Sequence, residues 1–256
     1  IAARTRVLDL LEDELRRRAP GTNKEDADIL DALASARDAD GRAVAPRAIA
    51  TEVFGYLFGS IANTYAAAAM CLLHVLCDPA LQRRVQAELD AARAPHGDAL
   101  HSAALRDLPV LNATYHETLR CYTPGLQLRM ARRPMRAGDY ELPAGSMVAF
   151  SAYLLHHDPA LYSDPEVFDA DRYLEGPRLP ARPPSNKNFL SYGRGLHACL
   201  GRHLARQEIL LATARLLRDY EVTLAPCDDP LAHTFLTNGV AAPKGPRVLS
   251  ARRRAA

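Results

Sequence analysis

Apolar residues recur at helical spacing over most of the first half of the chain. In residues 2–19, for example, Leu8, Leu11 and Leu15 fall on one face of a helix. Prolines and glycines separate the periodic stretches, and prolines open and close the longest of them. The pattern predicts helices over residues 2–19, 26–36, 46–78, 79–93 and 107–121, with a turn in the linker 94–104.

The pattern changes after residue 121, where short apolar alternations are broken by prolines and glycines. Residues 126–150 therefore predict small β-hairpins. The remainder predicts a short helix (153–161), a packed proline-rich segment (163–188), a long helix (202–220) and strands separated by turns (221–248). We expect a mainly α protein with small β-sheets, folded as a single domain over residues 1–256.

The composition narrows the class of protein without giving its function. A formal net charge of +2 over 256 residues gives no reason to expect nucleic acid as a partner. The five cysteines are an odd number without paired spacing, which argues against a disulfide framework and for a reducing compartment. We therefore expect a cytoplasmic protein.

The most apolar stretch, residues 53–76, carries polar side chains that are rare in a membrane span. These side chains belong to Asn63, Thr64, Tyr65 and His74. The stretch is therefore predicted to be a long buried helix. We expect no signal peptide and no membrane anchor in this chain, while an anchor preceding residue 1 stays open as an alternative.

Cys199 carries the strongest chemical signal. It lies in the ten residues 192–201, Tyr-Gly-Arg-Gly-Leu-His-Ala-Cys-Leu-Gly, directly before the predicted helix 202–220. The glycines let a backbone turn tightly and approach a flat ligand closely. The start of a helix favours a thiolate over a thiol. A thiolate in such a loop suits haem iron as a proximal ligand, whereas the competing interpretation is an inert buried cysteine in a helix-capping loop.

The ten residues resemble the cysteine-ligand loop of the cytochrome P-450 superfamily, the haem-thiolate proteins. That loop reads Phe-Gly-x-Gly-x-Arg/His-x-Cys-x-Gly. The matching residues here are Gly193, Gly195, His197, Cys199 and Gly201, and Tyr192 replaces the usual Phe. The resemblance implies haem b (iron protoporphyrin IX) as cofactor, with Cys199 as the iron ligand. It covers the C-terminal half of the family's fold, whose N-terminal half this chain lacks.

The resemblance extends to charged residues on both sides of this loop. Glu117 and Arg120 match the family's Glu-x-x-Arg helix, and Arg172 stands where a third charge locks the following segment beneath the cysteine loop. This triad would support haem incorporation. Arg129 and His197 are placed to reach the two haem propionates, because a guanidinium matches a carboxylate well. A solvated strand charge is the alternative for Arg129.

The long predicted helix is similar to the family's distal haem helix, with a departure at its centre. Gly59 and Ser60 keep the small residues of the usual Ala-Gly-x-Asp/Glu-Thr core, but Ala62 takes the acid position and Asn63 the threonine position. Neither side chain relays protons well, so the expected relay to oxygen is weakened. The Ala-Asn-Thr pattern resembles the sterol 7α-hydroxylase and prostacyclin synthase branch. Sliding the alignment by one residue would instead place Thr64 at the threonine position.

The resemblance implies a monooxygenase that inserts one atom of O2 into an apolar small molecule. Electrons would come from NAD(P)H through a reductase or ferredoxin, and Arg194, Arg202 and Arg206 would form either a docking face or ordinary solvated charges. One alternative is a haem-thiolate isomerase or a peroxide-dependent enzyme. Another is a truncated, non-catalytic haem-binding fragment.

Overall fold

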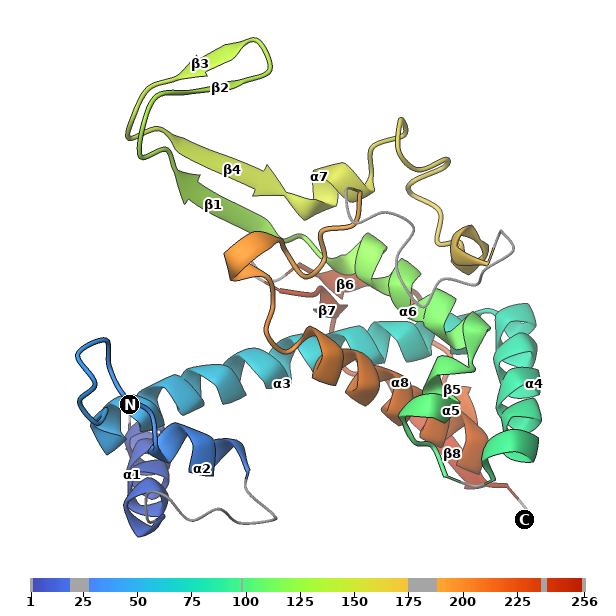
Figure 1. Ribbon diagram of the computed structural model, residues 1–256. Helices are drawn as coiled ribbons and strands as arrows, with labels where there is room; N and C mark the ends of the chain where they lie inside the picture. The colour runs from blue at the N-terminus through green and yellow to red at the C-terminus, as the bar shows by residue number, and fades with distance from the viewer. Residues whose placement is uncertain (1, 19–27, 98, 175–187, 236–238, 255–256) are drawn as a thin grey trace. The chain divides into compact units, whose positions relative to one another are not determined.

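The computed structural model describes residues 2–18, 28–97, 99–174, 188–235 and 239–254. There the chain is mainly helical with small sheets (Figure 1). The helices are α1 (Ala2–Arg17), α2 (Ile29–Ala34), α3 (Pro46–Cys77), α4 (Pro79–His96), α5 (Ser102–Arg106), α6 (Pro109–Tyr122), α7 (Ala152–His156) and α8 (Arg202–Asp219), with 3₁₀ turns η1 (Ala170–Tyr173) and η2 (Gly195–His197).

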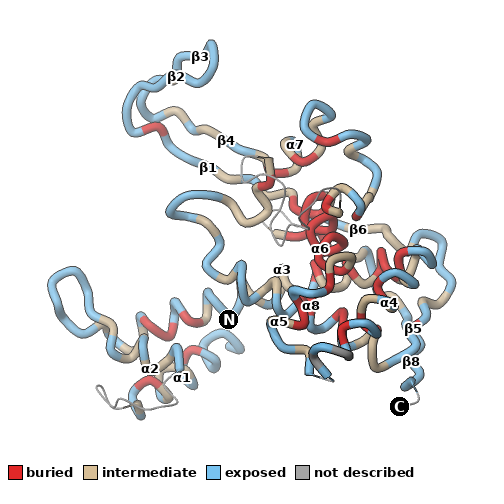
Figure 2. Tube along the Cα trace, turned by 45° about the vertical axis from the view of Figure 1, so that its right-hand side comes forward, coloured by how far each residue is buried: buried red, intermediate tan, exposed pale blue. Residues whose placement is uncertain are grey.

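The strands form two-stranded antiparallel sheets. They are β1 (Leu126–Met130) with β4 (Met147–Ser151), β2 (Met135–Ala137) with β3 (Tyr140–Leu142), β5 (Tyr220–Leu224) with β8 (Leu249–Arg253), and β6 (His233–Thr234) with β7 (Ala242–Pro243). The β2–β3 hairpin is largely exposed (Figure 2). The small hairpins predicted for residues 126–150 are therefore present.

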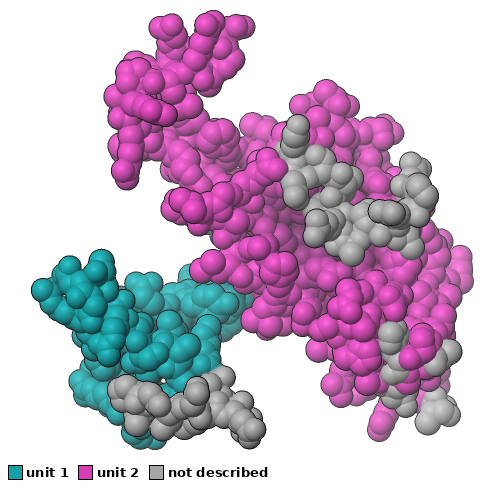
Figure 3. Space-filling view, viewed as in Figure 1, with its two compact units in different colours: residues 1–62 teal, residues 63–256 magenta. Residues whose placement is uncertain are grey.

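The chain divides into two compact units, residues 1–62 and 63–256, and α3 contributes to both (Figure 3). In the first unit, α1 buries Leu8 and Leu15, the face that the apolar pattern predicts, against the beginning of α3. α2 begins at Ile29 because the Asp28 carboxylate accepts the free N–H groups of the first turn. The single domain predicted for residues 1–256 stays a prediction.

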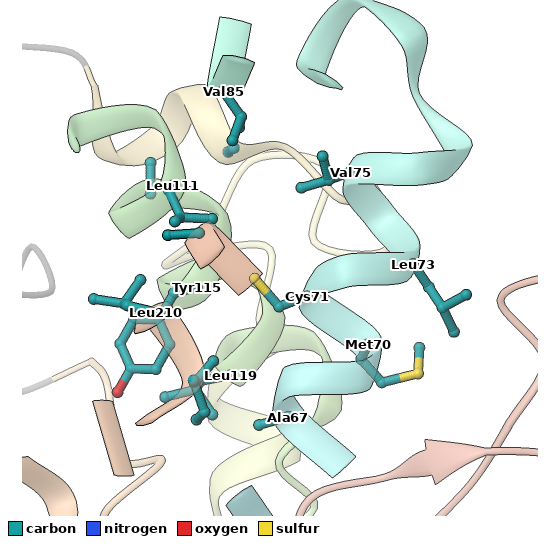
Figure 4. Packing of buried hydrophobic residues seen from close by; sticks show 14 of the residues in the cluster. Ala67, Met70, Cys71, Leu73, Val75, Val85, Leu111, Tyr115, Leu119 and Leu210 are labelled. Carbon is teal, nitrogen blue, oxygen red and sulfur yellow. The ribbon is translucent and has the colours of Figure 1, made fainter. Parts of the chain in front are cut away.

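The core of the second unit forms where the C-terminal half of α3 packs with α4, α6 and α8 (Figure 4). Its buried side chains include Met70, Cys71, Val75, Val85, Leu111, Tyr115, Leu119 and Leu210. Residues 111–120 of α6 are all buried, although several are polar or charged (Figure 2). Because most buried polar groups need partners, the polar side chains of α6 depend on the elements packed around it.

The prediction that residues 53–76 are buried holds for only part of α3. Residues 66–75 are mostly buried in the core of the second unit, but Phe58, Ile61 and Tyr65 expose 73%, 66% and 56% of their surface. On length and composition alone α3 could also cross a membrane, yet its C-terminal half packs within protein. Apolar composition predicts that a helix is buried, but it does not show which neighbouring element packs against each part of the helix.

Several element boundaries also differ from prediction. α4 continues through Pro95 to His96, and α5 occupies residues that the turn signals assigned to a linker. The cap of α5 is His101, whose Nδ1 accepts the N–H of Ala104 at 3.2 Å. α7 ends at His156, short of the predicted residue 161, because the next residues lead to Pro159, and a residue before proline avoids helical geometry. The last strand, β8, extends past residue 248 to pair with β5.

Candidate functional site

The cysteine loop, residues 190–201, turns back on itself just before α8. Gly193 and Gly195 have φ angles of 66° and 67°, a left-handed conformation that favours glycine. The Cys199 N–H donates to the Tyr192 carbonyl at 2.8 Å, and the Gly193 N–H donates to the Leu190 carbonyl at 2.9 Å. These bonds hold the backbone of Cys199 in place while its side chain stays exposed.

Gly193 also brings the cysteine loop against strand β1. A Cβ atom at residue 193 would stand 2.9 Å from the Gln127 amide nitrogen, so a side chain there would displace the Gln127 side chain. Alternate strand residues share a face, so Arg129 lies on the same face of β1 as Gln127. The exposed Arg129 side chain donates to the Leu128 carbonyl at 2.8 Å. The fold therefore puts this predicted cation on the side of the sheet that meets the loop.

Large apolar side chains are exposed on the cysteine loop and on the strand pair beside it. Leu196 and Leu200 of the loop expose 100% and 83% of their surface. Phe150 of β4 is also exposed, and it lies opposite Gln127 in the β1–β4 register, on the face that meets the loop. Exposed apolar groups gathered on one surface usually mark a binding site. The Cys199 thiol, the Arg129 guanidinium and the His197 imidazole lie on these same elements.

Helix α6 supports the cysteine loop from the other side. The Tyr115 and Tyr192 hydroxyls share a hydrogen bond of 2.6 Å. The Ser191 hydroxyl donates to the Leu119 carbonyl at 3.2 Å. Tyr192, which replaces the family's phenylalanine, thus gains a polar contact that phenylalanine lacks.

The three charges of the predicted triad meet at the buried end of α6. Glu117 accepts from Arg120 at 2.8 Å through both carboxylate oxygens, and from Arg172 Nε at 3.1 Å. Glu117 and Arg120 have no exposed surface. The Asp169 N–H adds a fourth bond to Glu117 at 2.9 Å. The carboxylate is thus surrounded by donors, as a buried charge requires.

Arg120 and Arg172 donate further hydrogen bonds to backbone carbonyls at the end of α7 and in the chain that follows it. Arg120 reaches the carbonyls of His156 at 2.8 Å and Pro165 at 2.7 Å. Arg172 reaches the Ser163 carbonyl at 2.7 Å. Burial is the largest single effect on Arg120 and lowers its pKa, but the hydrogen bonds to Glu117 and the electrostatic effect of neighbouring acidic groups together raise that pKa. The triad thereby ties the irregular segment 156–172 to α6.

His156 links the triad region to the cysteine loop, and sequence patterns did not point to it. Its Nε2 accepts the Leu190 N–H at 2.9 Å, and its Nδ1 lies 3.1 Å from the Arg120 carbonyl. Since Nε2 accepts, the proton of the neutral ring sits on Nδ1 and is donated to that carbonyl. Burial lowers the pKa of His156 to about 4. The neutral ring therefore fixes the start of the loop relative to α6.

Two further buried histidines share this low basicity, which predicts an acid-sensitive fold. Burial lowers the pKa of His74 to about 4 and that of His116 to about 3. In the unfolded chain each of these histidines has a pKa of about 6.5. Above that pH neither state is protonated, and these histidines cost no stability. As the pH falls toward 4 the unfolded chain takes up protons that the folded chain does not, and the free energy of unfolding decreases by up to about 1.4 kcal/mol per pH unit for each residue. Glu88, whose pKa burial raises to about 7, acts in the opposite direction but is a single group.

We therefore expect the denaturant concentration at the midpoint of unfolding to decrease as the pH is lowered from 6.5 to 4. His116→Phe supplies the matched variant, because both ring nitrogens of His116 are buried without a hydrogen-bond partner. This substitution should make the free energy of unfolding depend less steeply on pH, because about one proton fewer is taken up on unfolding. An unchanged slope in His116→Phe would show that His116 is not held neutral.

The three distal residues are consecutive on helix α3, where the boundary between the two compact units falls. Ala62 is the last residue of the first unit, and Asn63 and Thr64 belong to the second, all within α3. The Asn63 Oδ1 atom accepts the N–H of Val240 at 3.1 Å. The side chain of Asn63 thus contacts the segment that leads into β7.

Two charged residues have positions that their local patterns did not indicate. Glu88 accepts the Val110 and Leu111 N–H groups at 2.8 and 2.7 Å, and so caps the start of α6. Arg206, predicted as part of a surface face, is half-buried and donates to Asn112 of α6; burial lowers its pKa. No local signal could have revealed either contact, because each partner belongs to another helix.

An exposed thiol in a glycine-turned loop, braced by a buried ionic triad, is typical of the haem-thiolate class of proteins. The chain belongs to the cytochrome P450 family, whose model matches residues 4–250. The predicted superfamily and fold class are thereby confirmed, and membership implies haem, and hence iron, as the cofactor. The exposed Cys199 thiol, the exposed apolar side chains and the Arg129 guanidinium fit such a group.

Two curated relatives and one solved structure illustrate the similarity. A sterol 14α-demethylase of Mycolicibacterium vanbaalenii is 32% identical over 87% of this chain and 50% of its own length. The cyclooctat-9-en-7-ol 5-monooxygenase of Streptomyces melanosporofaciens is 30% identical over 84% of this chain and 46% of its own. Retinoic-acid-bound cyanobacterial CYP120A1 superposes with a TM-score of 0.81 at 25% identity, covering 99% of this chain and 57% of that one.

The chain thus spans about half the length of the curated relatives that it matches. The relatives named above carry other activities than the sterol 7α-hydroxylase and prostacyclin synthase branch that the α3 pattern resembles. That finer resemblance is not confirmed and stays a prediction.

Proposed function

We propose that this chain acts as a haem-thiolate monooxygenase that inserts one atom of O2 into an apolar small molecule. The observation that carries the proposal is the exposed Cys199 side chain, presented by a glycine-turned loop and surrounded by exposed leucines. Exposed apolar side chains gathered beside a thiol favour a binding site for a largely apolar ligand. Haem, held by Cys199, would supply the oxygen chemistry.

The residues divide the work of holding the cofactor. Cys199 would ligate the iron, while Arg129 and His197 would pair with the haem carboxylates. The glycines Gly193, Gly195 and Gly201 give the loop its shape. The ionic triad of Glu117, Arg120 and Arg172 holds the segment 156–172 against α6. His156 fixes the start of the cysteine loop relative to α6 through its bond to the Leu190 N–H.

Substrate and electron source follow by analogy with the relatives. The names of those above include a sterol and cyclooctat-9-en-7-ol, which favours a largely hydrocarbon substrate here. The family relationship favours electrons from NAD(P)H through a reductase or ferredoxin. We propose both as properties of the active protein.

A second candidate is a haem-thiolate isomerase or peroxide-dependent enzyme, which needs no external electrons. The Ala62 side chain has no exchangeable proton, and the Asn63 amide oxygen accepts the Val240 N–H. Neither residue supplies a proton relay, and this observation favours chemistry that does not require one.

The test begins with haem titration and the absorbance of the reduced, carbon-monoxide-bound form. We expect one haem per chain and a strongly red-shifted Soret band. Product formation that requires NAD(P)H and a redox partner would support the monooxygenase, whereas turnover of a peroxide without electrons would support the second candidate. Failure to bind haem stoichiometrically would contradict both and favour a non-catalytic fragment.

A further inference from the structure

The side chain of Asn63 makes a contact that its predicted catalytic role does not require. Its Oδ1 accepts the Val240 N–H at 3.1 Å, across 177 residues of sequence. Val240 is buried, with 7% of its surface exposed. A buried backbone N–H that loses its acceptor destabilises the structure. The amide of Asn63 is therefore part of what holds this segment in place.

The next residue along the segment is held from a second helix. The Ala241 N–H donates to the carbonyl of Tyr122, at the end of α6, with a distance of 2.8 Å. Two consecutive N–H groups thus find their acceptors on α3 and on α6. The following residues form β7, which pairs with β6 through His233 with Pro243 and Thr234 with Ala242. The segment 239–241 is fastened on both sides before the short sheet begins.

Gly239 is shaped to permit the contact. A Cβ atom at residue 239 would lie 2.0 Å from the Asn63 Oδ1 atom, which is an overlap, and the next nearest atom is the Asn63 amide carbon at 3.1 Å. The φ angle of Gly239 is 152°, which side-chain-bearing residues rarely adopt. Asn63 and Gly239 are therefore complementary: one supplies an acceptor, and the other leaves the room for it.

We propose that Asn63 is a positioning residue that latches the segment 239–241 onto helix α3, with Gly239 as its counterpart. The inference goes beyond the proposed function, since it assigns structural work to a residue at the position expected to relay protons. An amide does not titrate at ordinary pH, whereas it is well suited to accept a backbone hydrogen bond. Thr at this position has a shorter side chain whose hydroxyl tends to bond its own helix backbone.

This reasoning orders four substitutions. Asn63→Asp keeps an acceptor oxygen in the same place and should keep the latch. Asn63→Ala removes the acceptor, and Asn63→Thr draws it back toward α3, so both should release the segment. Gly239→Ala should release it from the other side. Asn63→Thr tests the proposal most directly, because it restores the usual family residue and yet should release the segment 239–241 from α3.

The measurement is amide hydrogen exchange of the peptide 239–243, which needs neither haem nor substrate. We expect exchange at Val240 to rise about tenfold in Asn63→Ala, Asn63→Thr and Gly239→Ala, as the loss of one hydrogen bond predicts, and to stay unchanged in Asn63→Asp. Residues 111–120 of α6 serve as the internal control and should keep their protection.

Three results would overturn the latch. They are unchanged exchange at Val240 in Asn63→Ala, equal loss of protection in Asn63→Asp and Asn63→Ala, and a parallel rise in α6 that signals general destabilisation. Because the readout is independent of haem, the proposed monooxygenase could fail its own test while the latch stands, and the reverse also holds.

Discussion

Arg120→Met is expected to destabilise the fold by about 3–5 kcal/mol, because it leaves a buried carboxylate without its main partner. Glu117 has no exposed surface and would keep only Arg172 and the Asp169 N–H. The carbonyls of His156 and Pro165 would also lose the donors that reach them. Denaturant unfolding of the purified variant measures the loss.

A matched control tests whether the large effect of Arg120→Met depends on burial of the ion pair, and a double variant tests whether it depends on the unpaired charge of Glu117. Arg84→Met makes the same substitution in a pair with Asp171 whose side chains are 42% and 52% exposed, and it should cost no more than about 1 kcal/mol. The double variant Glu117→Gln, Arg120→Met removes the unpaired charge and should be less destabilised than Arg120→Met alone. Equal costs for Arg84→Met and Arg120→Met would contradict the role given to the triad.

Cys199→Ser is expected to abolish the red-shifted Soret band of the reduced, carbon-monoxide-bound form while leaving the fold intact. The side chain is exposed, and the bond that fixes the residue uses its backbone N–H. The free energy of unfolding should therefore change by no more than about 0.5 kcal/mol. Loss of the band with an unchanged unfolding midpoint would identify the sulfur as the iron ligand.

The other cysteines provide the comparison. Burial raises the pKa of Cys71 and of Cys121 to about 12, so neither is ready to become a thiolate. Cys227 is exposed like Cys199 but lies in the turn after β5. Cys227→Ser should keep the Soret band, and survival of the band in Cys199→Ser would rule out the assignment of the ligand.

The local patterns of the chain predicted its elements well where one face is apolar. The Leu8 and Leu15 face of α1 is buried as expected, and the alternation after residue 121 forms hairpins. Predictions were less accurate where a boundary depends on a cap or a proline, as at His101 and Pro159. Such boundaries rest on single hydrogen bonds and steric contacts that periodicity does not record.

The candidate site shows the same division. Spacing alone located Cys199 among its glycines and placed Glu117 and Arg120 one helical turn apart. His156, Gln127 and Glu88 carried no such signal, because each acts on an element distant in the chain. Asn63 was located by its place in a motif, but its contact with Val240 spans 177 residues.

By itself the sequence determined the helical class, the family and the loop that presents a thiol, because these depend on periodicity and on short runs of residues. Only the tertiary structure decided that Glu117, Arg120 and Arg172 meet out of water, that a neutral His156 joins α6 to the cysteine loop, and that Asn63 holds the segment before β7. Burial and hydrogen-bond partners arise between elements remote in the chain, and they set which charges are costly and which side chains are fixed.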